Sequence, residues 1–447
     1  MDVGIIAGAL PYLESTSGLN ANQLSVIVAA VLLGSVLATL FAGVLADCLG
    51  RKLLMVCSGI LFVISIPAIA LSHGYGPLVF GRLLQGISAG LIGVVIPLYL
   101  AECLSASNRG RGTGVFQLLL TMGIVAAAVI GYYFSIQVEH VQKLNDPSKL
   151  FAFKDMAWRW IFWVSLPPGF LFVIGSLIVA ESPRWLFRHG KKEAAKIALL
   201  RSRTPEQANV EIQEMEETVA GERAHISQTG KHQKDFLLSR KYVIPFVLAC
   251  VILVCNQTTG IASIIGYNAN ILIQAGLNDK QAHLGYVILT VVNFCMTIGA
   301  IALVDKKGRK FLLALGSAGV IFSLLSVAIL FYNTEKNRVD CKDAVQAMVN
   351  SSGQKLAINF TGQMASMLLA ASGECGVKIS GIPVTMTIIY SYGDYSVATK
   401  VVRSDDVTQL DITRENCVPS NKIVAFFSNP FADFEAAHTA PLEIEHA

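Results

Sequence analysis

The stretch 47–52, Asp-Cys-Leu-Gly-Arg-Lys, has a second copy at 305–310, Asp-Lys-Lys-Gly-Arg-Lys. Each copy lies between two long segments that carry no charged side chain, so each is a short hinge between two apolar helices. A tag that recurs at the same place in two halves of a chain indicates two copies of one membrane-embedded unit, and paired units of this kind build transporters around a central site. The sequence therefore predicts a membrane transporter built from two related helical bundles.

The composition of the chain agrees with a membrane location. Of its 447 residues 53% are hydrophobic and 15% are charged, the net charge is +4, and the mean hydropathy is +0.56. Buried helices of a soluble protein would show a polar face, whereas eight segments here lack Lys, Arg, Asp and Glu altogether. Each is about 20 residues or longer, enough to cross the ~30 Å hydrocarbon core as a helix: 24–46, 53–72, 83–101, 112–134, 160–180, 242–270, 284–304 and 311–332.

Basic residues concentrate in one set of short loops, which together carry eight Lys and Arg: 47–52, 104–111 and 305–310. The loops of the other set carry only Lys280: 14–23, 73–77 and 271–283. The positive-inside rule therefore places the tagged loops in the cytoplasm. The connection 135–157 falls outside by parity, although it carries three lysines.

Counting spans from these loops divides the chain into four parts. They are an N-terminal transmembrane bundle whose first helix is incomplete, a cytoplasmic amphipathic linker, the first three helices of a C-terminal transmembrane bundle, and an extracytoplasmic soluble part: 1–180, 181–241, 242–332 and 333–447. The fold class we expect from these segments is an all-α integral membrane bundle with about 8–9 spans, plus a small extracytoplasmic α+β segment. We expect about three further spans beyond residue 447, which would make 333–447 an insertion in an outside loop.

Three smaller features complete this organisation. Residues 1–13 are apolar but too few to span, so they read as the second half of a first helix. Residues 382–402 alternate between polar and apolar side chains around a Gly-Asp turn, which predicts strands in the exported part. That part also holds three of the nine cysteines, of which one pair is available for a disulfide: Cys341, Cys375 and Cys417.

Several function classes are not expected. The chain shows no Cys or His spacing typical of zinc sites and no Gly-rich phosphate loop followed by Lys and Ser or Thr. We therefore expect no metal, no cofactor and no ATP-driven step. We also expect the chain not to be an enzyme and not to bind nucleic acid; its partners would be a lipid bilayer, a small solute and protons.

Five motifs, in order, resemble a known family. The run 43–52, Gly-Val-Leu-Ala-Asp-Cys-Leu-Gly-Arg-Lys, resembles the signature between the second and third helices of the major facilitator superfamily. The others resemble motifs of its sugar porter branch, with Ala180 in place of a proline before the last of them: Pro-Leu-Tyr-Leu-Ala-Glu at 97–102, Arg-Gly at 109–110, Trp-Arg-Trp at 158–160 and Glu-Ser-Pro-Arg-Trp-Leu at 181–186. The resemblance covers about residues 1–332 and extends to proton-linked monosaccharide transporters. It implies a helical bundle of the major-facilitator type, with about 8–9 spans present of an expected 12.

The resemblance implies a function. It implies secondary transport of a monosaccharide or related polyol across the cell membrane by alternating access, with proton symport. A facilitative uniporter, a transporter-like sugar sensor and a non-functional truncated product are alternatives that the sequence leaves open. The chain would be a multi-pass protein of the inner or plasma membrane, with residues 333–447 outside.

Charged side chains of these motifs gather at the predicted cytoplasmic mouth. Ion pairs there are expected to tie helix ends together and to break when the bundles rock; the alternative is that the positive charges only set orientation. The candidate residues of this charge network are Asp47, Gly50, Arg51, Glu102, Arg109, Glu181, Arg184, Asp305, Gly308 and Arg309.

Four amides stand within uncharged spans: Gln117, Asn256, Gln257 and Asn293. Amides donate and accept hydrogen bonds, which suits an uncharged polyhydroxylated ligand, although membrane amides also bond neighbouring helices. The resemblance places all four at sugar-binding positions. Other family contacts are altered, because their positions hold Ile124, Ala262 and Gly266, and the aromatic platform of the tenth helix has no counterpart.

Proton coupling is assigned by the resemblance to Asp2, in the context Met-Asp-Val-Gly, with Arg82 at the start of the fourth helix as its partner. An arginine lowers the pKa of a neighbouring acid until the acid takes up a proton and the pair breaks. The alternative is that Asp2 is a solvated residue at the chain's start. A further family acid is Ser165 here, which weakens the assignment.

Overall fold

The structure is a computed structural model, and most of it is helical. It describes residues 2–19, 21–104, 109–144, 146–229, 240–274, 277–335, 339–349, 354–371, 384–398, 402–404, 410–419, 422, 425, 429 and 431–447. The helices of the membrane part are α1 (Asp2–Thr16), α2 (Ala21–Leu49), α3 (Arg51–Ala70), α4 (Tyr75–Cys103), α5 (Arg109–Gln142), α6 (Pro147–Trp163), α7 (Leu166–Ile178), α12 (Arg240–Gln257), α13 (Ile261–Gln274), α14 (Asp279–Lys307) and α15 (Arg309–Glu335). Between α7 and α12 lie α8 (Pro183–Arg188), α9 (Lys192–Leu200) and α10 (Pro205–Thr229).

The predicted spans are confirmed. Within the described residues, eight helical segments are long and apolar enough to cross a membrane: Gln23–Leu49, Arg51–Ala70, Tyr75–Cys103, Gly114–Gln142, Pro147–Ile178, Val243–Ile273, Asp279–Val304 and Lys310–Leu330. Two expectations were wrong in detail. The connection expected at 135–157 is mostly helical, because α5 continues to Gln142 and α6 begins at Pro147. Arg82 does not open its helix, since α4 begins at Tyr75 and the arginine lies two turns inside it.

The first bundle is held by close backbone approach. Helix α2 packs along α4, and α3 packs against α4 and α7. At the α2–α4 contact a Cβ added to Gly86 would lie 2.2 Å from the carbonyl oxygen of Val31, so only glycine fits. Small residues at helix contacts favour association in membranes, where lipid removes most of the hydrophobic gain. These helices therefore form one tightly packed unit.

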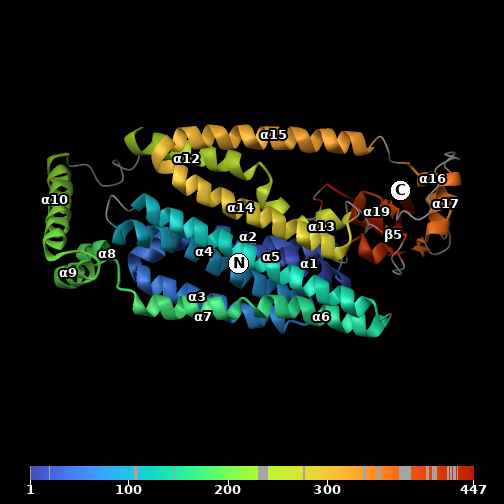
Figure 1. Cartoon of the computed structure of the whole chain (residues 1–447), viewed down its shortest axis with the longest axis horizontal. Helices are drawn as coiled ribbons and strands as arrows, with labels where there is room; N and C mark the ends of the chain where they lie inside the picture. The colour runs from blue at the N-terminus through green and yellow to red at the C-terminus, as the bar shows by residue number, and fades with distance from the viewer. Residues whose placement is uncertain are drawn as a thin grey trace.

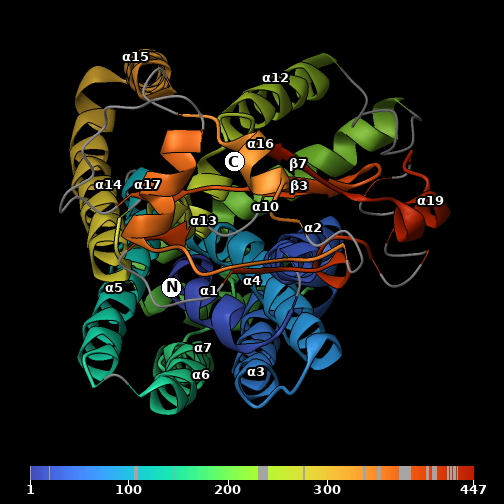
Figure 2. The same cartoon turned by 90° about the vertical axis from the view of Figure 1, so that its right-hand side faces the viewer.

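The second half contacts the first through a narrow set of helices. Helix α14 packs on α5, and α13 packs on α1, as the view along the bundle shows (Figure 2). Helices α12 and α15 lie on the outside of this half, and their apolar windows bury none of their residues within the described structure. The faces of α12 and α15 are thus open in this chain.

Helices α8–α10 lie at one end of the bundle, called the α8 end below, and the described residues of the tail, within 339–447, lie at the opposite end (Figure 1). Leu186, Phe187 and Ala195 form a small apolar cluster that joins α8 to α9. The part of 181–241 that the structure describes is mostly helical, and its role as a cytoplasmic linker stays a prediction. The charge network described below lies at this same end of the bundle.

The tail is a small α+β unit, as expected. Its helices are α16 (Lys342–Gln346), α17 (Gly362–Ala371), the 3-10 helix η1 (Arg414–Asn416) and α19 (Phe434–Thr439), and its strands are β1 (Leu356–Ile358), β2 (Thr385–Met386), β3 (Ile389–Tyr392), β4 (Tyr395–Ala398), β5 (Val402–Arg403), β6 (Leu410–Ile412) and β7 (Leu442–His446). The strands pair antiparallel as β1–β6, β2–β5 and β4-β3-β7. The predicted Gly-Asp turn joins β3 to β4, and Gly393 adopts a φ of 61° there.

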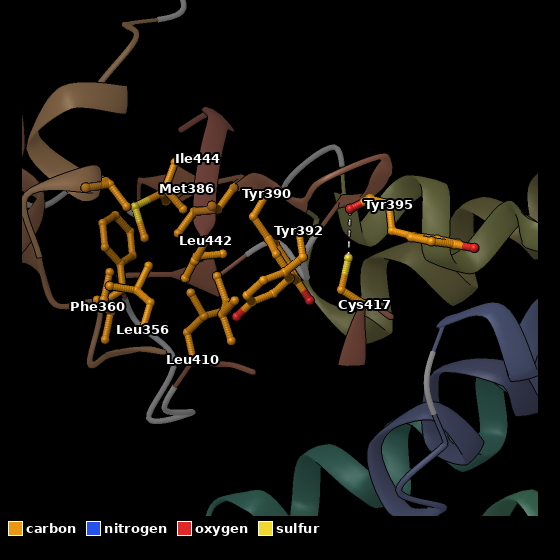
Figure 3. Close-up of a cluster of buried hydrophobic side chains, with 14 of the residues drawn as sticks. Leu356, Phe360, Met386, Tyr390, Tyr392, Tyr395, Leu410, Cys417, Leu442 and Ile444 are labelled. Carbon is orange, nitrogen blue, oxygen red and sulfur yellow. Dashed lines mark hydrogen bonds between the residues drawn. The ribbon is translucent and has the colours of Figure 1, made fainter. Parts of the chain in front are cut away.

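An apolar core of its own holds the tail together. Leu356, Tyr390, Tyr392 and Leu442 pack in its centre (Figure 3). Cys417 is also buried there, its Sγ lies 3.1 Å from the carbonyl oxygen of Tyr395, and burial raises the pKa of its thiol to about 11. Cys417 carries a free thiol, while Cys375 lies outside the described residues. The thiol of Cys417 therefore serves as a packed core side chain.

Candidate functional site

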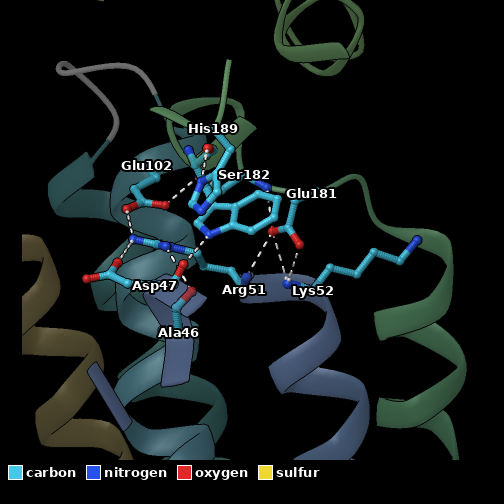
Figure 4. A network of polar contacts seen from close by, with 9 residues as sticks. Ala46, Asp47, Arg51, Lys52, Glu102, Glu181, Ser182 and His189 are labelled. Carbon is cyan, nitrogen blue, oxygen red and sulfur yellow. Dashed lines mark hydrogen bonds and ion pairs between the residues drawn. The ribbon is translucent and has the colours of Figure 1, made fainter. Parts of the chain in front are cut away.

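A network of polar contacts joins four helix ends at the α8 end (Figure 4). Its centre is Arg51, whose side chain is 4% exposed. Its Nη2 lies 2.8 Å from Glu102 Oε1 and 3.0 Å from Asp47 Oδ1, and its Nη1 donates to the carbonyl oxygen of Ala46 at 2.9 Å. One guanidinium thus holds the C-terminal ends of α2 and α4 at the start of α3, with the charge-assisted bonds that make such pairs strong.

Glu181 caps the start of α3 from a distant part of the chain. Its Oε1 accepts hydrogen bonds from the backbone N–H groups of Arg51 and Lys52, both at 3.0 Å. The first N–H groups of a helix have no intrahelical partner, and the helix dipole favours negative charge there. The carboxylate also accepts from the backbone N–H of Ser182 at 2.8 Å. Glu181 therefore fixes the segment before α8 to α3.

Gly50 makes room for this cap. It adopts a φ of 91°, which disfavours any residue with a side chain. A Cβ added at this position would lie 2.5 Å from Glu181 Oε2. Gly308 in the second copy of the tag has a φ of 79° and ends α14 in the same way. In both copies of the tag the positive φ thus favours glycine. In the first copy the close approach of Glu181 also leaves no room for a side chain.

Gly50→Ala is expected to lower the free energy of unfolding by about 2 kcal/mol or more, because a left-handed backbone and a close contact with Glu181 both oppose a methyl group. Gly308→Ala is expected to cost only about 1 kcal/mol, since nothing lies within 4 Å of the added Cβ. Gly43→Ala, on open helix surface within α2, serves as the neutral control. Unfolding in detergent micelles measures all three, and equal losses for Gly50→Ala and Gly308→Ala would contradict the crowding argument.

Three residues of the network were not among the predicted candidates, although they lie in the quoted motifs. Ser182 Oγ donates to Glu102 Oε2, Trp185 Nε1 donates to the carbonyl oxygen of Asp47 at 2.8 Å, and the Tyr99 hydroxyl donates to that of Ala180 at 2.8 Å. They bond mostly to backbone oxygens, which carry no sequence signal. Only their presence in the motifs 97–102 and 181–186 could have indicated them.

The structure describes only one side chain among the other predicted charged residues of the network. Arg184 lies at the start of α8 and is exposed. The side chains of Arg109, Asp305 and Arg309 lie outside the described residues. Ion pairs across the two bundles at this end therefore stay a prediction, whereas the contacts of Arg51, Glu102 and Glu181 lie within the first bundle and its linker.

The four amides lie on three helices. Gln117 is on α5, Asn256 and Gln257 end α12, and Asn293 is on α14. All four are exposed. The structure brings α5 and α14 into contact, which places Gln117 and Asn293 on neighbouring helices, but it shows no hydrogen bond between the described amide side chains. Their exposure leaves their hydrogen-bonding groups open to a ligand.

The helix that carries two of these amides is interrupted. Helix α12 ends at Gln257, and α13 begins at Ile261 after Gly260, which has a φ of 78°. The hydroxyls of Thr258 and Thr259 donate to the carbonyl oxygens of Cys255 and Asn256, which satisfies part of the released backbone. Irregular backbone at membrane depth is tolerated where it lines a cavity, and broken helices mark binding sites in transporters.

The predicted coupling pair is half described. Arg82 is 2% exposed, its Nη1 donates to Gln85 Oε1 at 2.7 Å, and its guanidinium lies 5.6 Å from the ring centre of Phe162. Asp2 begins α1, but its side chain lies outside the described residues. A buried arginine requires a compensating negative charge. Ile5 of α1 belongs to the same apolar cluster as Phe162, so the start of α1 shares a core with the ring beside Arg82.

Comparison with known proteins gives consistent results. A family model described as "Sugar (and other) transporter" matches residues 8–372. The glucose transporter GlcP of Staphylococcus epidermidis is 32% identical over 333 residues, which are 74% of this chain and 68% of that protein. The chain spans about two thirds of the length of the curated relatives that it matches.

Solved structures share the fold. The partially occluded inward open form of the xylose transporter XylE from E. coli superposes with a TM-score of 0.61 at 24% identity, covering 74% of this chain and 76% of that one. The proton:xylose symporter XylE bound to 6-bromo-6-deoxy-D-glucose gives a TM-score of 0.58 at 25% identity, covering 69% and 66%. The arrangement of the described helices is therefore that of a major-facilitator bundle.

Proposed function

We propose that this chain carries a monosaccharide or a related polyol across the cell membrane by alternating access. The proposal proceeds from its family, because the chain belongs to the Sugar (and other) transporter family. The chain is a multi-pass membrane protein of the major facilitator superfamily. The observation that carries the proposal is the interruption between α12 and α13 directly after Asn256 and Gln257. It exposes amides at a broken helix, beside a span that carries a further amide, Asn293.

The chemistry of this region suits an uncharged, hydroxyl-rich solute. Each amide offers two donor hydrogens and an oxygen acceptor, so Gln117, Gln257 and Asn293 can match sugar hydroxyls in either sense. None of the three carries a charge, which disfavours an ionic substrate. The relatives GlcP and XylE transport glucose and xylose according to their names, and these two sugars are the first probes to use.

The four-part division of the chain and its orientation belong to the same proposal. The α8 end carries the tagged loop 47–52 and the linker 181–241, so it lies in the cytoplasm, and the tail lies outside the cell. Proton symport is the proposed mode, with Asp2 as the proton carrier and Arg82 as its partner, and facilitated uniport is the alternative. The network around Arg51 is the described part of the cytoplasmic charge network, whose ion pairs tie helix ends together and break when the bundles rock.

Gln117→Ala and Gln257→Ala are each expected to weaken sugar binding by about 1–2 kcal/mol, about five- to thirtyfold in Kd, since a lost hydrogen bond leaves a polar group of the sugar unpaired. Calorimetry with D-glucose and D-xylose on the purified full-length protein measures the change. Gln213→Ala on α10, outside the spans, is the matched control and should leave affinity unaltered. Unchanged affinity in both variants for a sugar that the unaltered protein binds would reject the assignment.

A further inference from the structure

A second polar cluster lies at the tail end of the bundle, far from the charge network. The Tyr12 hydroxyl donates to Asp279 Oδ2 at 2.8 Å. His283 Nδ1 lies 2.8 Å from the carbonyl oxygen of Asp279 and 3.4 Å from its Oδ1, and Nε2 lies 3.3 Å from the carbonyl oxygen of Gly8. The ring of Tyr12 stacks on that of His283, with centroids 5.6 Å apart and planes 4° apart. The cluster joins α1 of the first half to α14 of the second.

Most of this cluster is buried. His283 is 0% exposed and Tyr12 is 1% exposed, while the side chain of Asp279 is 33% exposed. The imidazole fits because α5 presents a glycine to it: a Cβ added to Gly131 would lie 3.3 Å from His283 Cδ2 and 3.1 Å from Gly8 Cα. Below it Tyr286 is also 0% exposed, and its hydroxyl donates to the carbonyl oxygen of Gly4 at 3.3 Å. Water therefore does not reach the rings of Tyr12 and His283 while the cluster is formed.

The contact differs in kind from those inside a bundle. Between α2 and α4 the backbones are in direct contact at glycines, and no side chain fits between them. Between α1 and α14 the contact is made by side-chain hydrogen bonds, which water can replace when the helices part, so the net free energy of each bond is small. A partly buried polar contact between α1 and α13 repeats the pattern, with Asn270 Nδ2 3.1 Å from Glu14 Oε2. A hydrogen-bonded contact suits a seam that opens and closes.

We propose that Tyr12, Asp279 and His283 form a latch that closes the extracytoplasmic side of the transport pathway. The proposal rests on the proposed function, because alternating access requires the two halves to separate at this end in one state and to meet in the other. The three are positioning residues: they select the state that is closed to the outside and do not contact the amides. Weakening them shifts the population toward the state open to the outside.

Labelling of a buried reporter tests the latch. Ala128 on α5 is 0% exposed and packs with Ala7 and Tyr286 below the latch. In the full-length protein with its nine native cysteines replaced by serine, Ala128→Cys is exposed in intact cells to a membrane-impermeant maleimide. Tyr12→Phe, which keeps the stacked ring, and His283→Phe, which keeps a ring without nitrogens, are each expected to raise the labelling rate about tenfold, since each removes bonds to a charged or buried partner. Lys280→Gln breaks an exposed ion pair with Glu139 and leaves the buried cluster intact, so it should change the rate less than twofold.

The outcomes separate the latch from the transport function. Labelling that stays unchanged in both latch variants, or that rises as much in Lys280→Gln, overturns the latch. Counterflow of D-glucose and D-xylose in the same cells tests transport independently. Faster labelling of the latch variants supports the latch even where the unaltered chain exchanges neither sugar, a result that rejects the proposed substrates. If Tyr12→Phe labels faster while its purified form stays monodisperse, the change is one of state and not of folding.

Discussion

Asp2→Asn in the full-length protein is expected to abolish accumulation of sugar against a gradient while leaving sugar exchange intact. An asparagine keeps the size and most of the hydrogen bonds of the acid but cannot carry a proton. Arg82 is buried in α4, so its charge stabilises whichever state brings a carboxylate to it. Protonation of the acid breaks that pair and frees the bundles to rock, which links proton binding to transport.

The measurement compares two assays on one preparation. Uptake of labelled D-xylose into proteoliposomes with an inward proton gradient reports accumulation, and counterflow without a gradient reports exchange. Asp155→Asn, whose carboxylate pairs with Arg159 outside the pathway, is the control and should keep both activities. Accumulation that survives in Asp2→Asn would remove Asp2 as the coupling site and favour uniport or another ion. Loss of exchange as well would show that Asp2 acts in binding and not in coupling alone.

The hydropathy of the sequence was enough to predict the spans and the class of fold. Uncharged segments such as 24–46 and 284–304 appear as α2 and α14, because in lipid a backbone must satisfy its own hydrogen bonds as a helix. The Gly-Asp turn of the tail was predictable for a local reason too, since Gly393 takes a positive φ between two short strands. Features set by neighbouring residues could thus be predicted from the sequence.

Contacts between residues far apart in the sequence could not be predicted. Tyr12 and Asp279 are 267 residues apart, and no periodicity joins them. The cap that Glu181 forms on α3 uses backbone N–H groups, which every helix start presents. Helix α4 begins eight positions earlier than expected, at Tyr75, because Arg82 interrupts the uncharged run and was taken as its edge. The sugar-binding roles of Gln117, Asn256, Gln257 and Asn293 stay predictions, as a ligand's contacts depend on the packed state.

Arg51→Ala is expected to lower the free energy of unfolding by about 3 kcal/mol, since removing one partner of a buried ion pair leaves the other without compensation. Glu102 is only 11% exposed, and without Arg51 it keeps the hydroxyl of Ser182 as its described partner. The carbonyl oxygen of Ala46 also loses a donor. Counterflow of D-glucose should fall at least tenfold, because the ends of α2 and α4 are no longer held at the start of α3.

Two comparisons separate the network from charge as such. Lys192→Ala breaks an ion pair with Glu216 in which the side chains are 58% and 49% exposed, so it should change stability by less than about 1 kcal/mol. Adding Glu102→Ala to Arg51→Ala should restore part of the lost stability, because it removes the orphaned carboxylate. Reversible unfolding in mixed detergent measures each variant. If Arg51→Ala lowers the free energy of unfolding no more than Lys192→Ala does, the arginine of the tag serves only to orient the chain in the membrane. A partial recovery of that free energy in the double variant would show that Arg51 and Glu102 act as a pair.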